Sequence, residues 1–177
     1  MCKKFTLVLG GASSGKSDIS EKLCIYSNLN LTYLASAEVY DEEMRTKVEQ
    51  HRTKRDANWR TIEEPLRADA VIRAAQADEV LLFDCASLWL TNHLLADHAL
   101  DEETDQLIAA IQATPAEIVV VSNEVGLGIV PDNALARRFR IAQGQLNRRL
   151  ASEADCVIGV MAGLPFALKG ALPEGLA

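Results

Sequence analysis

The chain has 177 residues, of which 49% are hydrophobic and 24% are charged, and this size and composition predict one globular domain spanning residues 1–177. The formal net charge of −7 argues against broad binding to nucleic acids or anionic membranes, because both favour proteins with a basic surface. The sequence has no uncharged apolar run of about 18 residues that would suit a membrane span, and no leader pattern precedes the first apolar run. The four cysteines lack the spacing of metal ligands. We therefore expect a cytoplasmic protein with free thiols.

Short apolar runs alternate with longer amphipathic stretches along the chain, and this pattern is typical of an α/β fold with a mainly parallel sheet. Strands are predicted at residues 5–9, 31–35, 79–83, 118–121 and 157–161. Helices are predicted at residues 17–26, 41–54, 66–75, 87–95, 102–112 and 134–152. Apolar residues of the last helix recur in steps of three and four, so one of its faces is expected to pack on the sheet. The region around Pro165 and Pro173 is expected to be a frayed end.

The loop after the first predicted strand carries the strongest functional motif. Its spacing fits the phosphate-binding pattern G-x-x-x-x-G-K-[ST], with the residues Gly10-Gly11-Ala12-Ser13-Ser14-Gly15-Lys16-Ser17. In that pattern the backbone N–H groups wrap a polyphosphate, the lysine reaches the β- and γ-phosphates, and the serine hydroxyl ligates Mg²⁺. The N-terminus of the following helix adds partial positive charge to the same phosphates. The alternative is a Gly/Ser-rich turn with no function.

Polar residues also follow the other central strands, at the edge where parallel sheets bind ligands. Ser36 follows the second predicted strand, and Asn123 and Glu124 come shortly after the fourth. Asp84 directly follows the third, the position at which a Walker B carboxylate holds Mg²⁺. The alternative for Asp84 is a side chain that caps the next helix.

The segment 41–65 goes beyond generic phosphate binding, because it places a histidine among cations. His51 ends an apolar helical stripe at positions 40, 44 and 48 and lies close to Arg52 and Arg55. One interpretation is a structural histidine on a packed helix face. The other is a nucleophile, since neighbouring arginines would hold a phosphate and lower the pKa of the imidazole, which keeps its nitrogen unprotonated.

These motifs together resemble the bifunctional adenosylcobinamide kinase/adenosylcobinamide-phosphate guanylyltransferase family of cobalamin biosynthesis. The resemblance covers nearly the whole chain. It rests on ordered blocks at residues 10–17, 33–37, 41–44, 51–52, 59–65, 84–85, 90–92, 122–131, 135–140, 144–147 and 162–165.

The resemblance implies a three-layer fold like that of P-loop NTPases, with a mainly parallel central sheet of the RecA-like type. It also implies two reactions: phosphorylation of the adenosylcobinamide hydroxyl by ATP or GTP, then transfer of GMP from GTP to give adenosylcobinamide-GDP. His51 and Lys16 would be catalytic, with His51 carrying the GMP, and Ser17 and Asp84 would hold Mg²⁺. Nucleotide contacts are implied for Gly10, Gly11, Ala12, Ser13, Ser14, Gly15, Lys16, Ser17, Ala35, Ser36, Arg52, Thr53, Lys54, Arg55, Glu63 and Asp84. Members of this family form homotrimers, so the resemblance implies a homotrimer here as well.

Two other functions remain open on the residues alone. A P-loop kinase of another small alcohol would share the loop and Asp84 but would not need His51. A non-catalytic GTP-binding switch would share the loop too, although it normally carries an Asn-Lys-x-Asp run, which this sequence lacks.

Overall fold

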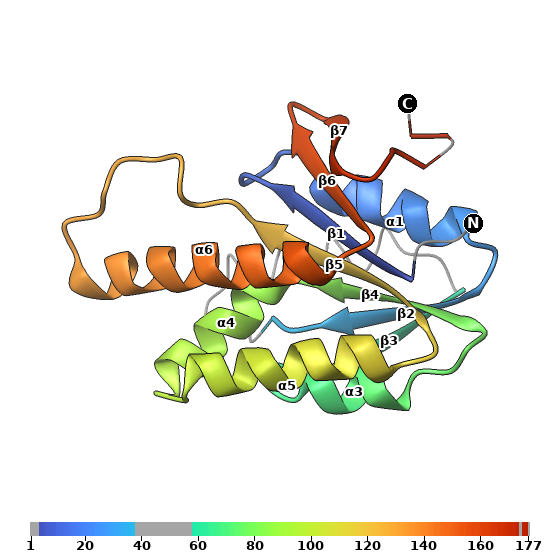
Figure 1. The fold of residues 1–177 in the computed structure, drawn as a ribbon, viewed down its shortest axis with the longest axis horizontal. Helices are drawn as coiled ribbons and strands as arrows, with labels where there is room; N and C mark the ends of the chain where they lie inside the picture. Colours follow the sequence, from blue (N-terminus) through green and yellow to red (C-terminus); the bar gives the residue numbers. More distant parts are fainter. Residues whose placement is uncertain (1–3, 38–57, 174, 177) are drawn as a thin grey trace.

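The computed structural model describes residues 4–37, 58–173 and 175–176. Within them lies one sheet of seven strands in the order β3-β2-β4-β5-β1-β6-β7 (Figure 1). Every neighbouring pair is parallel except the last, in which β7 runs antiparallel to β6. This confirms the predicted α/β fold with a mainly parallel sheet. The strands are β1 (Phe5–Gly10), β2 (Asn30–Ala35), β3 (Trp59–Glu63), β4 (Glu79–Asp84), β5 (Glu117–Asn123), β6 (Cys156–Met161) and β7 (Leu164–Lys169).

The described helices lie close to the predicted ones, with ends that differ by two residues or fewer. They are α1 (Lys16–Tyr26), α3 (Ala68–Ala74), α4 (Ala86–Leu95), α5 (Leu100–Ala113) and α6 (Ala134–Glu153). The helix predicted at residues 41–54 falls outside the described part of the chain. None of the described helices is long and apolar enough to cross a membrane.

Alternating side chains of the central strands feed two separate apolar cores, one on each face of the sheet. Leu7 and Phe83 join the core under α3, α4, α5 and α6, whereas Val8 and Leu82 join the core under α1. Strands buried on both faces read as continuous apolar runs, which is why the sequence predicts them well. The result is a three-layer arrangement with α1 on one side and the other described helices opposite (Figure 1).

The expectation of a frayed C-terminal end is wrong for Leu164–Lys169, which forms edge strand β7. Met161 pairs with Leu164, so Ala162 and Gly163 alone make the turn from β6. Both have positive φ, 53° and 79°, as a two-residue turn of type I′ requires. Pro165 suggested an end to regular structure, but an edge strand tolerates a proline because one side of it needs no ladder hydrogen bond.

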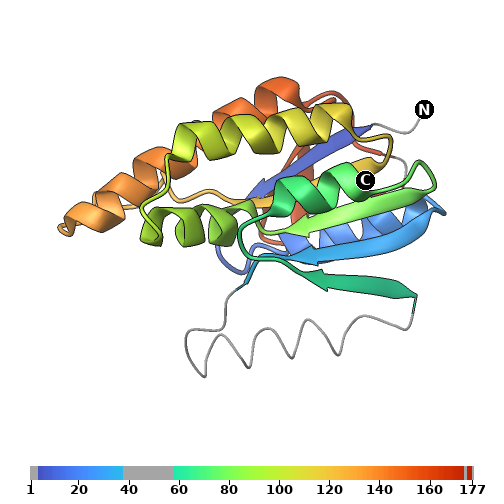
Figure 2. The same cartoon turned by 90° about the horizontal axis from the view of Figure 1, so that it is seen from below.

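Strand β3 is a second element that the sequence analysis did not predict, and it forms the opposite edge of the sheet (Figure 2). Its apolar residues are few and face opposite sides. Trp59 packs with the core under α1, its ring 6.2 Å from that of Tyr33, while Ile62 packs with the core on the other side. Two apolar residues in five give no clear strand period.

Helix α6 covers the core from Phe139 onward but not with its first turn. Leu146 and Leu150 are buried there, but Leu135 in the first turn is 46% exposed. The N-terminal half and the loop between β5 and α6 extend beyond the sheet (Figure 1). The predicted apolar stripe is therefore longer than the part of α6 that covers the core.

Candidate active site

The phosphate loop lies between β1 and α1, at the carboxyl edge of the sheet. The Ser14 amide donates to the Gly11 carbonyl at 3.3 Å, and the Ile19 amide donates to the Gly15 carbonyl at 3.1 Å. Gly15 precedes α1 with a φ of 93°, a left-handed conformation that L side chains rarely adopt. Local sequence thus sets the loop geometry, and α1 begins with its N-terminus facing the loop.

The turn between β6 and β7 supports this loop from outside, a role that the sequence analysis missed. The Gly163 amide donates to the Ser14 carbonyl at 2.9 Å. A Cβ added to Gly15 would lie 3.2 Å from the Gly163 Cα, and one added to Gly10 would lie 2.7 Å from the Val160 carbonyl oxygen. The glycines of the motif therefore also allow close packing against the β6–β7 hairpin. The Ala-Gly pair at 162–163 is the sequence signal that could have pointed to this turn.

Lys16 is half-buried and its ammonium donates to the Gly11 carbonyl at 3.0 Å. Among the described residues it forms no ion pair. Burial lowers the pKa of Lys16 below its usual range, and the negative charge of Asp84 opposes that effect. A half-buried cation beside backbone amides at a helix N-terminus matches the chemistry of a polyphosphate, so this donor set fits the triphosphate of a nucleotide.

Asp84 ends β4, with β5 between it and the strand that leads into the phosphate loop. The Tyr33 hydroxyl donates to Asp84 Oδ2 at 3.0 Å, which orients the carboxylate. Ser17 and Asp84 lie at the same edge of the sheet and offer a hydroxyl and a carboxylate, oxygen ligands of the kind that Mg²⁺ takes. These two residues fit the proposed magnesium site.

Ser36 holds the ends of β2 and β4 together. Its hydroxyl donates to the Cys85 carbonyl at 2.7 Å and accepts from the Cys85 amide at 3.0 Å. The Asn92 side chain donates to the Ser36 carbonyl at 2.9 Å and to the Pro65 carbonyl at 3.0 Å. Ser36 is fully buried, so the structure places it in a scaffold next to Asp84. Burial raises the pKa of the Cys85 thiol to about 12, which keeps it protonated and inert.

A buried polar cluster ties the end of β5 to α6. The Ser122 hydroxyl donates to Asn147 Oδ1 at 2.6 Å, and Gln143 Nε2 donates to the Ser122 hydroxyl at 2.9 Å. Asn147 Nδ2 in turn donates to the Asn123 carbonyl at 3.0 Å. The Glu124 amide then donates to the Gly10 carbonyl at 3.0 Å, so β5 continues alongside the phosphate loop. These amide side chains also escaped the sequence analysis, because they meet only in the fold.

The other candidate residues lie away from the phosphate loop or outside the described residues. Ala35 pairs with both Asp84 and Glu63 across the sheet. Strand β3, which ends at Glu63, is four strands from β1, or about 19 Å at the usual strand spacing. The nucleotide contacts predicted for Ala35 and Glu63 therefore lie on the β3 side of the site. The candidates in the segment between β2 and β3 lie outside the described residues: His51, Arg52, Thr53, Lys54 and Arg55.

Comparisons with known proteins agree with this geometry. Residues 6–168 match the model of a family described as cobinamide kinase / cobinamide phosphate guanyltransferase. The bifunctional adenosylcobalamin biosynthesis protein CobP of Pseudomonas aeruginosa is 45% identical over 93% of this chain and 96% of its own length. The bifunctional adenosylcobalamin biosynthesis protein CobU of Salmonella typhimurium is 40% identical over 92% of this chain and 98% of its own length.

A solved structure shows the same fold at much lower identity. The flagellar accessory protein FlaH from Methanocaldococcus jannaschii aligns with a TM-score of 0.51 at 16% identity, over 95% of this chain and 79% of that one. Together with the strand order and the loop after β1, this confirms the P-loop NTPase-like, RecA-like fold. By its match to the family model and its similarity to these two relatives, the chain belongs to the cobinamide kinase / cobinamide phosphate guanyltransferase family.

Proposed function

We propose that this protein phosphorylates adenosylcobinamide with ATP or GTP and then transfers GMP from GTP to the resulting phosphate, giving adenosylcobinamide-GDP. Membership of the family supports both activities. The observation that carries the proposal is the phosphate loop, whose half-buried Lys16 has only a backbone carbonyl as its hydrogen-bond partner among the described residues. Residues 1–177 would then act as one nucleotide-binding domain serving both steps.

In the kinase step, the loop amides and Lys16 bind the β- and γ-phosphates, while the substrate hydroxyl oxygen forms a bond to the γ-phosphorus and its proton is released to water. The bond from that phosphorus to the bridging oxygen breaks, and the nucleoside diphosphate leaves. Ser17 and Asp84 would hold Mg²⁺, which would neutralise the charge that develops on the phosphate oxygens. Tyr33 holds the Asp84 carboxylate through its hydroxyl.

In the guanylyl step, a ring nitrogen of His51 attacks the α-phosphorus of GTP and pyrophosphate leaves. The phosphate of adenosylcobinamide-phosphate then attacks the same phosphorus, and the P–N bond breaks. We propose that Arg52 and Arg55 hold the α-phosphate during both displacements. Thr53, Lys54, Ala35 and Glu63 complete the proposed nucleotide contacts, while the buried Ser36 supports the site from the scaffold.

The proposal is tested by incubating the full chain with adenosylcobinamide, GTP and Mg²⁺ and following the products by mass. We expect adenosylcobinamide-phosphate first and adenosylcobinamide-GDP afterwards. Turnover of a small alcohol without any corrinoid requirement would indicate the alternative kinase. Binding of GTP with no product from the corrinoid would favour a non-catalytic GTP-binding protein.

Replacing Asp84 with asparagine should raise the Mg²⁺ concentration needed for turnover and slow both reactions at least about tenfold, because it removes a metal-facing charge without changing side-chain size. The measurement is the initial rate as a function of Mg²⁺ concentration. Asp78→Asn is a matched control, since Asp78 is an exposed carboxylate that precedes the amino end of β4. An unchanged metal dependence in Asp84→Asn would leave Asp84 with a structural role only, as the acceptor of the Tyr33 hydroxyl.

We also propose a homotrimer located in the cytoplasm. Large apolar side chains are exposed on the extension formed by the β5–α6 loop and the start of α6, including Leu127 at 85%, Ile129 at 96% and Val130 at 65%. Burial of these groups between copies would remove them from water. The mass measured by sedimentation tests the assembly. Cys24, Cys85 and Cys156 are buried and free, which supports a reducing compartment.

A further inference from the structure

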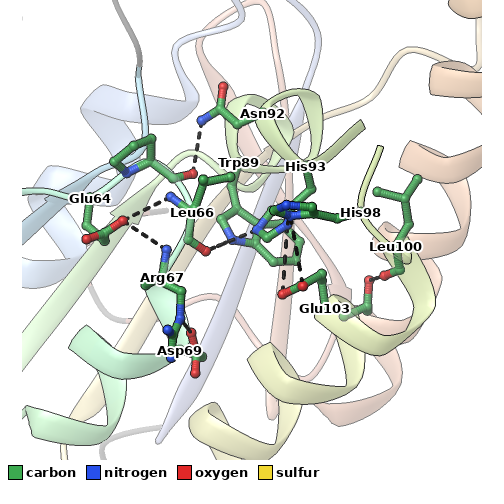
Figure 3. Close-up of polar contacts among 12 residues, drawn as sticks. Glu64, Leu66, Arg67, Asp69, Trp89, Asn92, His93, His98, Leu100 and Glu103 are labelled. Carbon is green, nitrogen blue, oxygen red and sulfur yellow. Dashed lines mark hydrogen bonds and ion pairs between the residues drawn. The ribbon is translucent and has the colours of Figure 1, made fainter. Parts of the chain in front are cut away.

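Three potential metal ligands meet where α4 leads into α5 (Figure 3). His93 lies in the last turn of α4, His98 lies in the connection, and Glu103 lies in the first turn of α5. His93 Nδ1 is 2.9 Å from His98 Nδ1, 3.8 Å from one Glu103 carboxylate oxygen, and the other oxygen is 4.0 Å from His98 Nδ1. The phosphate loop and Asp84 are not part of this cluster.

The contacts of His93 fix which of its nitrogens carries the hydrogen. Its Nε2 lies 3.0 Å from the Leu66 carbonyl oxygen, which only accepts hydrogen bonds. Nε2 therefore donates, and in the neutral ring the lone pair of Nδ1 points toward His98 and Glu103. The Trp89 indole donates to the same carbonyl at 2.9 Å, and its ring lies 4.5 Å from the His93 ring. His93 is thus held firmly, with the lone pair of Nδ1 facing the other two groups and within hydrogen-bond distance of His98 Nδ1.

We propose that His93, His98 and Glu103 bind one divalent transition-metal ion such as Zn²⁺, through the two Nδ1 atoms and the Glu103 carboxylate. Tetrahedral zinc with bonds of about 2.0–2.1 Å separates its ligand atoms by about 3.3 Å. The two Nδ1 atoms lie 2.9 Å apart, and each lies 3.8 or 4.0 Å from a different Glu103 oxygen, so these distances straddle that value. Small side-chain rotations therefore suffice to bring the ligands into place, and a water molecule takes the fourth position.

The surroundings of the cluster match those of metal-binding histidines. A ligating imidazole commonly donates its second N–H to a backbone carbonyl, as His93 does to Leu66. His98 is 41% exposed, so its other nitrogen can carry a hydrogen toward water while Nδ1 binds the ion. Two imidazoles and one carboxylate favour zinc-like ions over Mg²⁺, which prefers oxygen ligands. Burial lowers the pKa of His93, so protons compete weakly for it at neutral pH.

An ion at this site would brace the scaffold of the nucleotide site. It would join the end of α4 to the start of α5 and fix the ring that holds the Leu66 carbonyl. Asn92, the residue before His93, holds the Ser36 and Pro65 carbonyls. Metal binding is therefore expected to stabilise the folded protein, since an ion that binds only the folded state raises its stability.

The test is a calorimetric titration of the metal-free full chain with Zn²⁺ in excess Mg²⁺, together with thermal unfolding. His51→Ala serves as the background, because His51 is the only histidine outside the cluster. We expect one Zn²⁺ per chain and a higher Tm with Zn²⁺. His98→Gln should weaken binding at least about tenfold, as loss of a ligand exceeds loss of an outer-shell partner. Glu103→Gln should also weaken it, whereas Glu102→Gln, the same charge change one residue away, should not.

Co²⁺ gives an independent readout, because tetrahedral Co²⁺ absorbs visible light far more strongly than hydrated Co²⁺. The absorption should appear with the parent chain and be lost in His98→Gln. His98 is exposed, so this variant does not depend on refilling a core position. Equal Zn²⁺ affinity in the parent chain and His98→Gln, or no Zn²⁺ binding by the parent, would overturn the proposal. The cluster would then be a hydrogen bond between two imidazoles.

Discussion

Lys16→Ala is expected to slow both the kinase and the guanylyl transfer reactions by about 100-fold or more, because it removes a preorganised charge from the triphosphate site. The ammonium is half-buried and Asp84 contributes to keeping it charged. Water cannot replace the positive charge that Lys16 brings to the triphosphate site. The rates are measured separately, with adenosylcobinamide plus ATP and with adenosylcobinamide-phosphate plus GTP.

Lys22→Ala is the matched control for this experiment. Lys22 lies on the same helix and is exposed, so the substitution makes the same chemical change away from the loop. We expect its rates to stay near those of the parent protein. If Lys16→Ala retained kinase turnover near the parent rate while losing guanylyl transfer, the two reactions would not share one triphosphate site.

The central strands could be predicted from the sequence because burial on both faces leaves continuous apolar runs. Strand β4, with Val80, Leu81, Leu82 and Phe83 all buried, is such a case. The edge strands could not, because each packs few side chains and carries no clear alternation. Trp59 and Ile62 of β3 face opposite cores. In β7, Pro165 suggested the end of regular structure. Edge strands are defined by their pairing partners, which a linear pattern does not reveal.

In the candidate site, too, features set by consecutive residues could be predicted and contacts between distant segments could not. The phosphate loop could be predicted because its geometry comes from eight consecutive residues, and Asp84 because it directly follows an apolar strand. The Gly163 amide reaches Ser14, and Asn92 reaches Ser36 and Pro65, only after the sheet has formed. The spacing of His93, His98 and Glu103 fits no single helix face, so the turn between α4 and α5 is what brings them together.

His51→Ala is expected to abolish guanylyl transfer while some kinase activity remains. Transfer of the γ-phosphoryl group to a hydroxyl needs positioning and metal but no protein nucleophile. The proposed guanylyl transfer instead divides into two displacements at the α-phosphorus, with a P–N bond to His51 between them. A single substitution should therefore separate two reactions that Lys16→Ala impairs together.

The P–N bond itself can be detected with GTP labelled at the α-phosphate. The parent protein should keep the label after denaturation, lose it in acid and retain it in base, as a phosphoramidate does. His51→Ala should take up none, whereas Gln50→Ala, a change at the adjacent position, should label normally. If His51→Ala still acquired acid-labile label, another residue would carry the nucleotide. If the parent formed adenosylcobinamide-GDP without ever holding label, the phosphate of the corrinoid would attack GTP directly, and His51 would not be the nucleophile.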